Sequence, residues 1–210
     1  MIRTACVSVL FAVLTVAAGR WLTHDFAVWT AEGARRWQVQ QAPVAMPPVQ
    51  LQTPSHGVQP LAALLGNGRH VTVMSFFYTR CPSICLALGN TLQQMQLALQ
   101  RQPPAAAVQL LSVSFDPAHD GPHALQAYSR QMRADPVLWQ FATPVDAAAL
   151  RTLLTPLGVV VIADGRGGFD HNAALLVINR QGQLVRIFDD TDHEAALAFA
   201  TDLAEKETGR

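Results

Sequence analysis

Two cysteines stand at the point where a buried strand is expected to turn into a helix. Residues 71–79 form an apolar run of the length of a buried strand. Apolar residues then recur at helical spacing from Leu86 to Gln100. Cys81 and Cys85 lie between these two segments. The chain is therefore constrained to form a strand–helix unit that carries both thiols at its junction.

The start of a helix is a place that activates thiols. Backbone N–H groups there favour negative charge, which lowers the pKa of a thiol and favours the thiolate. Pro82 suits the first helical position because it has no N–H to leave unpaired. Since thiolates bind Cu(I) and zinc, the pair is a candidate redox couple or soft-metal site. A local structural disulfide, or two buried thiols, is the alternative.

Composition limits the partners of this chain. Its 210 residues suit one domain of roughly 150 residues with an additional segment. The formal net charge is zero, which argues against nucleic acid as a partner. Apart from Cys6, which lies in an N-terminal apolar run, Cys81 and Cys85 are the only cysteines. One pair is too few for a disulfide framework.

The N-terminus indicates export. Arg3 precedes an uncharged stretch from Thr4 to Gly19, which is short for a membrane span and matches the core of a signal peptide. Trp21 and Trp29 extend the apolar character and are typical of membrane interfaces. We therefore expect an uncleaved single-pass anchor in the inner membrane, with the following domain in the periplasm. A cleaved signal peptide is the alternative.

Three regions are predicted along the chain. Residues 1–22 form the anchor or signal peptide, residues 23–48 a juxtamembrane helix and a Pro/Gln-rich linker, and residues 49–210 the folded domain. Within the domain, strands alternate with helices before a hairpin and a last helix. This order predicts an α/β fold with a mixed central sheet flanked by helices, and the cysteine position favours a thioredoxin-like fold. The expected elements after the cysteines are a strand at 108–115, helices at 122–133 and 147–155, a hairpin at 173–188 and a helix at 194–205.

Two sulfurs do not complete a copper or zinc site, so a third ligand is expected. His171 stands out among the seven histidines because it follows a glycine-rich loop, residues 164–170, and precedes an apolar strand. A histidine on such a loop can approach the cysteine junction. A loop histidine without a ligand role is the alternative.

At this point the sequence resembles a known family. Residues 76–85, which contain both cysteines, resemble the copper motif of the Sco/SenC family. Residues 111–120 resemble its second signature, a strand ending in Asp-Pro and a further Asp. Residues 169–172 and 176–182 resemble its histidine segment and the hairpin after it. The three occur in the family's order and extend over about residues 49–206.

The resemblance implies a thioredoxin-like domain that binds one copper, as Cu(I) or Cu(II), through Cys81, Cys85 and His171, with Asp116 lining or orienting the site. It implies a metallochaperone for the copper centre of cytochrome c oxidase, a thiol–disulfide reductant of the oxidase subunit, or both. The implied partners are that subunit or another copper enzyme, a thiol reductant and the inner membrane. Leu86 and Ser83 differ from the proline and acidic residue that are common in the family.

Other functions are compatible with two cysteines on this fold. A thiol–disulfide oxidoreductase without copper delivery needs Cys81 and Cys85 but not His171. A non-catalytic envelope binding module needs only a structural disulfide. A peroxidase is disfavoured because Tyr78 stands where peroxiredoxins usually place Thr or Ser.

Overall fold

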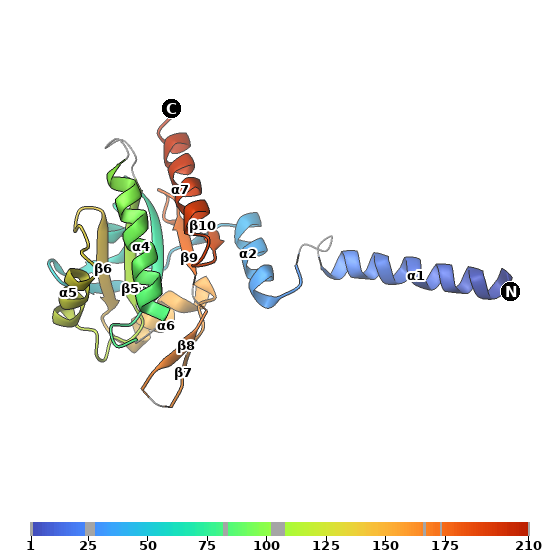
Figure 1. Ribbon diagram of the computed structural model, residues 1–210, viewed down its shortest axis with the longest axis horizontal. Helices are drawn as coiled ribbons and strands as arrows, with labels where there is room; N and C mark the ends of the chain where they lie inside the picture. Colours follow the sequence, from blue (N-terminus) through green and yellow to red (C-terminus); the bar gives the residue numbers. More distant parts are fainter. Residues whose placement is uncertain are drawn as a thin grey trace. The chain divides into compact units, whose positions relative to one another are not determined.

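The computed structural model describes residues 2–23, 28–81, 84–101, 108–165, 167–172 and 174–209, without the side chains of residues 2, 3, 5, 22 and 84–87. The chain divides into two compact units, Met1–Gln41 and Ala42–Arg210. The first unit contains helices α1 (Ile2–Leu22) and α2 (Ala31–Gln41). The second contains the sheet (Figure 1).

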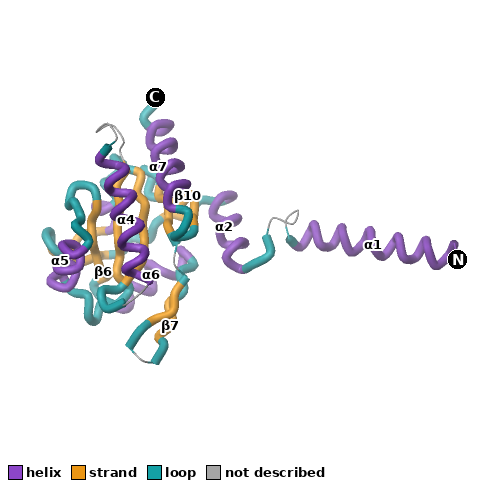
Figure 2. The backbone as a smooth tube through the Cα atoms, in the orientation of Figure 1, coloured by secondary structure: helices purple, strands orange, loops and turns teal. Residues whose placement is uncertain are grey.

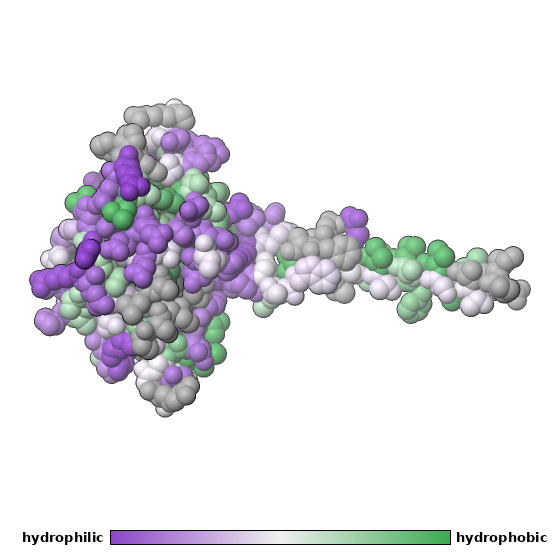
Figure 3. Space-filling model, viewed as in Figure 1, coloured by the Kyte–Doolittle hydropathy of each residue, from purple (hydrophilic) through white to green (hydrophobic). Residues whose placement is uncertain are grey.

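Helix α1 covers the segment in which an anchor is expected. Its described apolar side chains, such as Leu10 and Phe11, are exposed along the helix (Figure 3). In the described part of the chain, no helix combines the length and apolar character that a membrane crossing requires. The expected transmembrane anchor at residues 1–22 is therefore not supported. The uncharged run ends at Gly19, before Arg20, and its ~24 Å of helix is shorter than a ~30 Å hydrocarbon core.

A mixed eight-stranded sheet forms the centre of the second unit, in the order β1-β10-β9-β4-β5-β6-β2-β3. Strands β4, β5 and β6 are parallel, and the strands on either side of them pair in antiparallel fashion. Figure 2 shows these strands behind the helices. The bounds are β1 Val44–Ala45, β2 Gln50–Thr53, β3 Gly57–Pro60, β4 Val71–Phe77, β5 Val108–Ser114, β6 Trp139–Pro144, β9 Leu175–Ile178 and β10 Gln183–Phe188.

The central strands form where the sequence predicts them. Every residue of β4 and β5 is buried, which explains their continuous apolar character, because parallel strands are covered on both faces. Their register pairs Val71 with Val108 and Phe77 with Ser114. The predicted mixed α/β fold with a sheet flanked by helices is confirmed.

Helices α4 (Ile84–Gln100) and α7 (His193–Glu207) contact each other and the central strands, and they lie side by side in Figure 1. Helix α5 (Pro122–Gln131) adjoins α4, because a Cβ on Gly89 would lie 2.5 Å from the Met132 sulfur just after α5. The Gln93 amide also donates to the Met132 carbonyl at 3.1 Å. These helices therefore share one face of the sheet.

Helix α6 (Ala147–Leu157), predicted at residues 147–155, has a cap at each end. The Asp146 carboxylate accepts a hydrogen bond from the Ala149 N–H at 2.8 Å, and Gly158 ends the helix at φ 62°. The helix ends at Leu157, two residues beyond the predicted Thr155, and Pro156 lies inside its last turn. A short helix, α3 (Leu61–Leu64), precedes β4.

The segment before His171 differs from the prediction. Phe169 and Asp170, which were expected to end the glycine-rich loop, belong to strand β8 (Phe169–His171), which pairs with β7 (Val161–Ala163) in a hairpin. Residues 164, 165, 167 and 168 lie in the connection between the two strands, as expected. At the hairpin tip, the Asp164 carboxylate accepts a hydrogen bond from the Gly168 N–H at 2.9 Å. His171 therefore lies at the end of strand β8 rather than in a loop.

Candidate functional site

The segments that carry Cys81 and Asp116 meet at one edge of the sheet. Because β4 and β5 are parallel and in register, the segments that follow them emerge at the same edge. Cys81 lies four residues after the end of β4, and Asp116 lies two residues after the end of β5. Thr79 and Asp120, which are 41 positions apart in sequence, are thereby brought into contact.

Cys81 ends the turn after β4. It is buried, with 9% of its surface exposed, and its N–H donates to the Tyr78 carbonyl at 3.4 Å. Cys85 is the second residue of α4, and its side chain lies outside the described residues. Among the described side chains, no group of three or more His, Cys, Asp or Glu is placed to hold a metal ion. The ligand set of Cys81, Cys85 and His171 therefore stays a prediction.

Asp120 fixes the turn that carries Cys81. Its carboxylate is fully buried and accepts hydrogen bonds from the Thr79 N–H at 2.8 Å and the Thr79 hydroxyl at 2.6 Å. It also accepts a bond from the Ser114 hydroxyl at 2.6 Å. One carboxylate thus joins the cysteine turn to the end of β5. In the sequence, Asp120 stands out only as part of the 111–120 motif, four residues after Asp116.

Asp116 holds Arg80, the neighbour of Cys81. The Asp116 carboxylate is buried and accepts a hydrogen bond from Arg80 Nη2 at 2.8 Å. Nδ1 of His119 lies 2.8 Å from the same carboxylate. Nearly half of the Arg80 side chain is exposed, so a positive charge is held at the surface next to the cysteine turn. Sequence reasoning missed Arg80 and His119, because their contacts depend on how two strand ends meet.

His171 offers an unused nitrogen to this region. Its Nδ1 is buried and makes no hydrogen bond among the described residues. Burial lowers the pKa of His171, and the nearby carboxylates of Asp190 and Asp170 oppose this effect. The imidazole is therefore neutral at neutral pH, which is the form that binds a metal. Since buried polar atoms are usually paired, this nitrogen fits a ligand role.

Aromatic rings connect the histidine to the cysteine turn. The ring of Phe115, which precedes Asp116, lies 4.9 Å from the His171 ring. Tyr78, three residues before Cys81, lies 5.3 Å from Phe115 and 5.1 Å from Phe169. The three elements predicted to supply the site, β8 and the segments after β4 and β5, therefore pack on one another.

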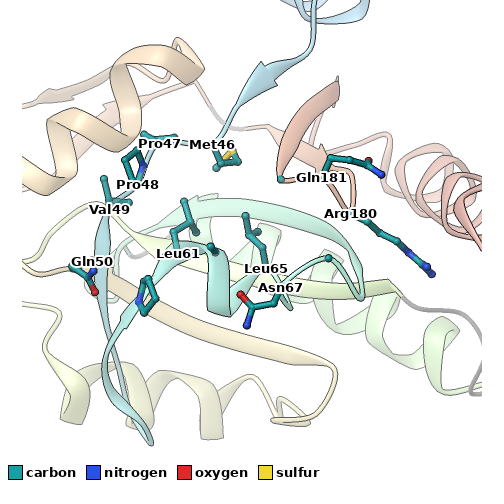
Figure 4. Close-up of a pocket in the computed structure, with 14 residues that line it drawn as sticks. Met46, Pro47, Pro48, Val49, Gln50, Leu61, Leu65, Asn67, Arg180 and Gln181 are labelled. Carbon is teal, nitrogen blue, oxygen red and sulfur yellow. The ribbon is translucent and has the colours of Figure 1, made fainter.

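A separate pocket lies near the start of β4. It has a volume of about 330 Å³, and Met46 and Pro47 lie across from Leu61 and Leu65 (Figure 4). Arg180 is the one charged residue among the described residues that line it. None of the predicted site residues lines this pocket, so it is not part of the candidate site.

Several solved structures are similar to this chain in fold. Arabidopsis thaliana ScoI with copper bound is 15% identical, with a TM-score of 0.67 over 78% of this chain and 99% of that one. Apo Sco1 from Thermus thermophilus is 25% identical, with a TM-score of 0.58 over 77% of this chain and 90% of that one. BsSco, a member of the Sco family of cytochrome c oxidase assembly proteins in which a disulfide switch was identified, is 17% identical, with a TM-score of 0.65 over 77% and 95%.

The family assignment rests on the sequence as well. A comparison with curated proteins finds no match. The family model for SCO1/SenC matches residues 64–204, which include the cysteine turn, the strand end with both aspartates, and the histidine hairpin. This match extends over more than half of the 210 residues. The chain therefore belongs to the SCO1/SenC family.

Proposed function

We propose that this protein binds one copper ion as cargo and delivers it to a copper enzyme, with the copper-centre subunit of cytochrome c oxidase as the client. The observation that carries the proposal is the buried Nδ1 of His171, which makes no hydrogen bond to any residue that the structure describes, on a hairpin that packs against Phe115 and Tyr78. Family membership and the copper bound by Arabidopsis ScoI support it.

Each ligand has a distinct part in the proposed site. Thiolates of Cys81 and Cys85 hold Cu(I), because soft sulfur ligands favour that ion. The neutral imidazole of His171 adds a nitrogen ligand, which matters most for Cu(II). Asp120 fixes the turn before Cys81 through Thr79, so the backbone at this end of the site is held when cargo is absent. Asp116 orients Arg80 beside the turn.

The same cysteines support a second activity. Closing a disulfide between Cys81 and Cys85 releases two electrons and two protons, which reduce one disulfide of a client to two thiols. The disulfide switch identified in BsSco favours this candidate. A thiol reductant must then restore the pair, and His171 is not needed. We propose that either activity takes place outside the cytoplasm, in the periplasm, since the chain begins with an apolar helix.

Copper titration of the reduced full-length protein under anaerobic conditions tests the proposal. A chromophoric Cu(I) competitor should report one tightly bound equivalent in the wild type. Cys81→Ser and Cys85→Ser should each abolish tight binding. Cys6→Ser is the matched control, because Cys6 is exposed on α1, and should change nothing. Full affinity in either Cys81→Ser or Cys85→Ser would place the copper site elsewhere.

His171→Ala separates the two activities. It should weaken Cu(II) binding strongly and Cu(I) binding less, while disulfide formation survives. A His171→Ala strain with normal oxidase activity and normal copper loading would favour the thiol reductant instead.

A further inference from the structure

We propose that Phe169 is a positioning residue that anchors the β7–β8 hairpin on Tyr78 and Phe115, so that His171 is held facing the cysteine turn. This inference rests on the proposed copper function, because it explains how the nitrogen ligand is kept in place. It concerns a residue that has no ligand atom itself.

The hairpin needs an anchor because the main sheet does not supply one. In the described residues, β7 and β8 pair only with each other. An isolated two-stranded hairpin is marginally stable in water. Its outer strand is open to solvent, with 60% of Ile162 exposed. Side-chain contacts must therefore hold the hairpin on the domain.

Strand alternation puts Phe169 and His171 on the same face of β8. Residues two apart in a strand point the same way, whereas Asp170 between them points to the other face and is exposed. Ile162 pairs with Asp170 across the hairpin, so it shares that exposed face. The inward face of the hairpin thus carries both the ring and the imidazole.

Phe169 closes a three-ring cluster. Its ring lies 5.1 Å from Tyr78 at an interplanar angle of 81°, and 5.4 Å from Phe115 at 79°. Both are edge-to-face arrangements, which aromatic pairs prefer. Tyr78 and Phe115 are themselves 5.3 Å apart. Because Tyr78 precedes Cys81 by three residues, the cluster connects the histidine strand directly to the cysteine turn.

The backbone next to Phe169 also lies close to this cluster. A Cβ on Gly168 would lie 3.4 Å from the Tyr78 hydroxyl oxygen and 2.7 Å from an Asp164 carboxylate oxygen. At the base of the hairpin, the Asn172 side chain accepts from the Val160 N–H at 2.8 Å and donates to the Gly158 carbonyl at 3.2 Å. Asn172 therefore fixes the base and Phe169 the inward face, with His171 between them.

Loss of the anchor should lower the fraction of molecules in which His171 faces the cysteines. The apparent dissociation constant rises as that fraction falls, because binding must first select the competent arrangement. The effect should be confined to binding that uses the imidazole. Cu(II) affinity should therefore fall while Cu(I) affinity, carried by the thiolates, changes little.

The test compares four variants of the full-length protein: Phe169→Ala, Phe169→Leu, His171→Ala and the control Ile162→Ala. We expect Phe169→Ala to weaken Cu(II) binding about tenfold or more and to reduce the nitrogen coupling in the Cu(II) electron paramagnetic resonance spectrum. Phe169→Leu should give a smaller loss, and it serves as the folded replacement if Phe169→Ala does not fold. Ile162→Ala, on the exposed face of the same hairpin, should bind Cu(II) as the wild type does.

A metal-free readout keeps this inference separate from the copper proposal. Nuclear Overhauser contacts between the His171 and Phe115 rings should be present in the wild type and lost or weakened in both Phe169 variants. If those contacts and Cu(II) affinity persist in the folded variants, Phe169 does not position the histidine, whatever the protein's cargo. If the wild type binds no copper, the proposed function fails, whereas loss of the ring contacts in the Phe169 variants still shows that Phe169 positions the histidine.

Discussion

Replacing Asp120 should cost the domain much of its stability. In Asp120→Ala the Thr79 N–H loses its acceptor, and the hydroxyls of Thr79 and Ser114 lose a charged partner. An unsatisfied buried donor costs about 1–3 kcal/mol, and each lost hydroxyl bond contributes about 1 kcal/mol. We therefore expect the free energy of unfolding to fall by about 3–5 kcal/mol.

Asp120→Asn should lower the free energy of unfolding by less than Asp120→Ala does. An amide oxygen at the Oδ2 position still accepts from the Thr79 N–H and the Ser114 hydroxyl. The amide nitrogen then faces the Thr79 hydroxyl, which can rotate to accept. The loss should be about 1–2 kcal/mol, because neutral hydrogen bonds replace charge-assisted ones.

Urea denaturation of the wild type, both Asp120 variants and Thr79→Val measures these energies. Asp192→Ala is the control, since Asp192 is exposed and its side chain makes no cap bond, and it should stay within about 0.5 kcal/mol of the wild type. In a double-mutant cycle, Thr79→Val and Asp120→Ala should couple by about 1 kcal/mol or more. A loss below about 1 kcal/mol in Asp120→Ala, or simple additivity, would refute the role of Asp120 as the clamp of this turn.

Two further predictions concern stability. The pKa of His70 is lowered by burial and by the charges of Arg69 and Arg180, so the unfolded chain binds the proton more readily than the folded one. The His70 contribution to the free energy of unfolding should thus be constant above the ordinary histidine pKa of 6.5 and should fall as the pH drops below it. His70→Gln should show a shallower decline of that free energy in urea unfolding between pH 8 and 5.5, and an unchanged slope would contradict the assignment. Gly158→Ala should lower the free energy of unfolding by about 1 kcal/mol, because Gly158 has φ 62°. The control Gly121→Ala, at φ −70° with open space around its Cβ, should leave thermal unfolding unchanged. Equal effects of the two substitutions would exclude backbone strain as the cause.

Local sequence signals predicted the parts of the fold that depend on neighbouring residues. The continuous apolar runs in the sequence of β4 and β5 indicate strands that are buried on both faces. Asp146 and Gly158 mark the two ends of α6. The placement of Cys81 just after β4 followed from the same run. These features are encoded within a few residues, and tertiary packing agrees with them.

The missed features depend on contacts between distant segments. Asp120 binds Thr79, 41 positions away, and no local pattern reveals that bond. The first two residues of strand β8 were expected to be loop because the glycines before them favour turns, yet the strand forms by hairpin pairing with β7 and by the ring contacts of Phe169. The two residues of β1 lie in the predicted linker and join the sheet by pairing with β10, near the other end of the chain.

X-ray absorption at the copper edge tests the proposed ligand set most directly. The sample is the full-length protein loaded with one equivalent of Cu(I) under reducing, anaerobic conditions. The proposal predicts a first shell of two sulfurs from Cys81 and Cys85 and one nitrogen from His171, with only the nitrogen lost in His171→Ala. A first shell without sulfur, or a nitrogen that persists in His171→Ala, would contradict it.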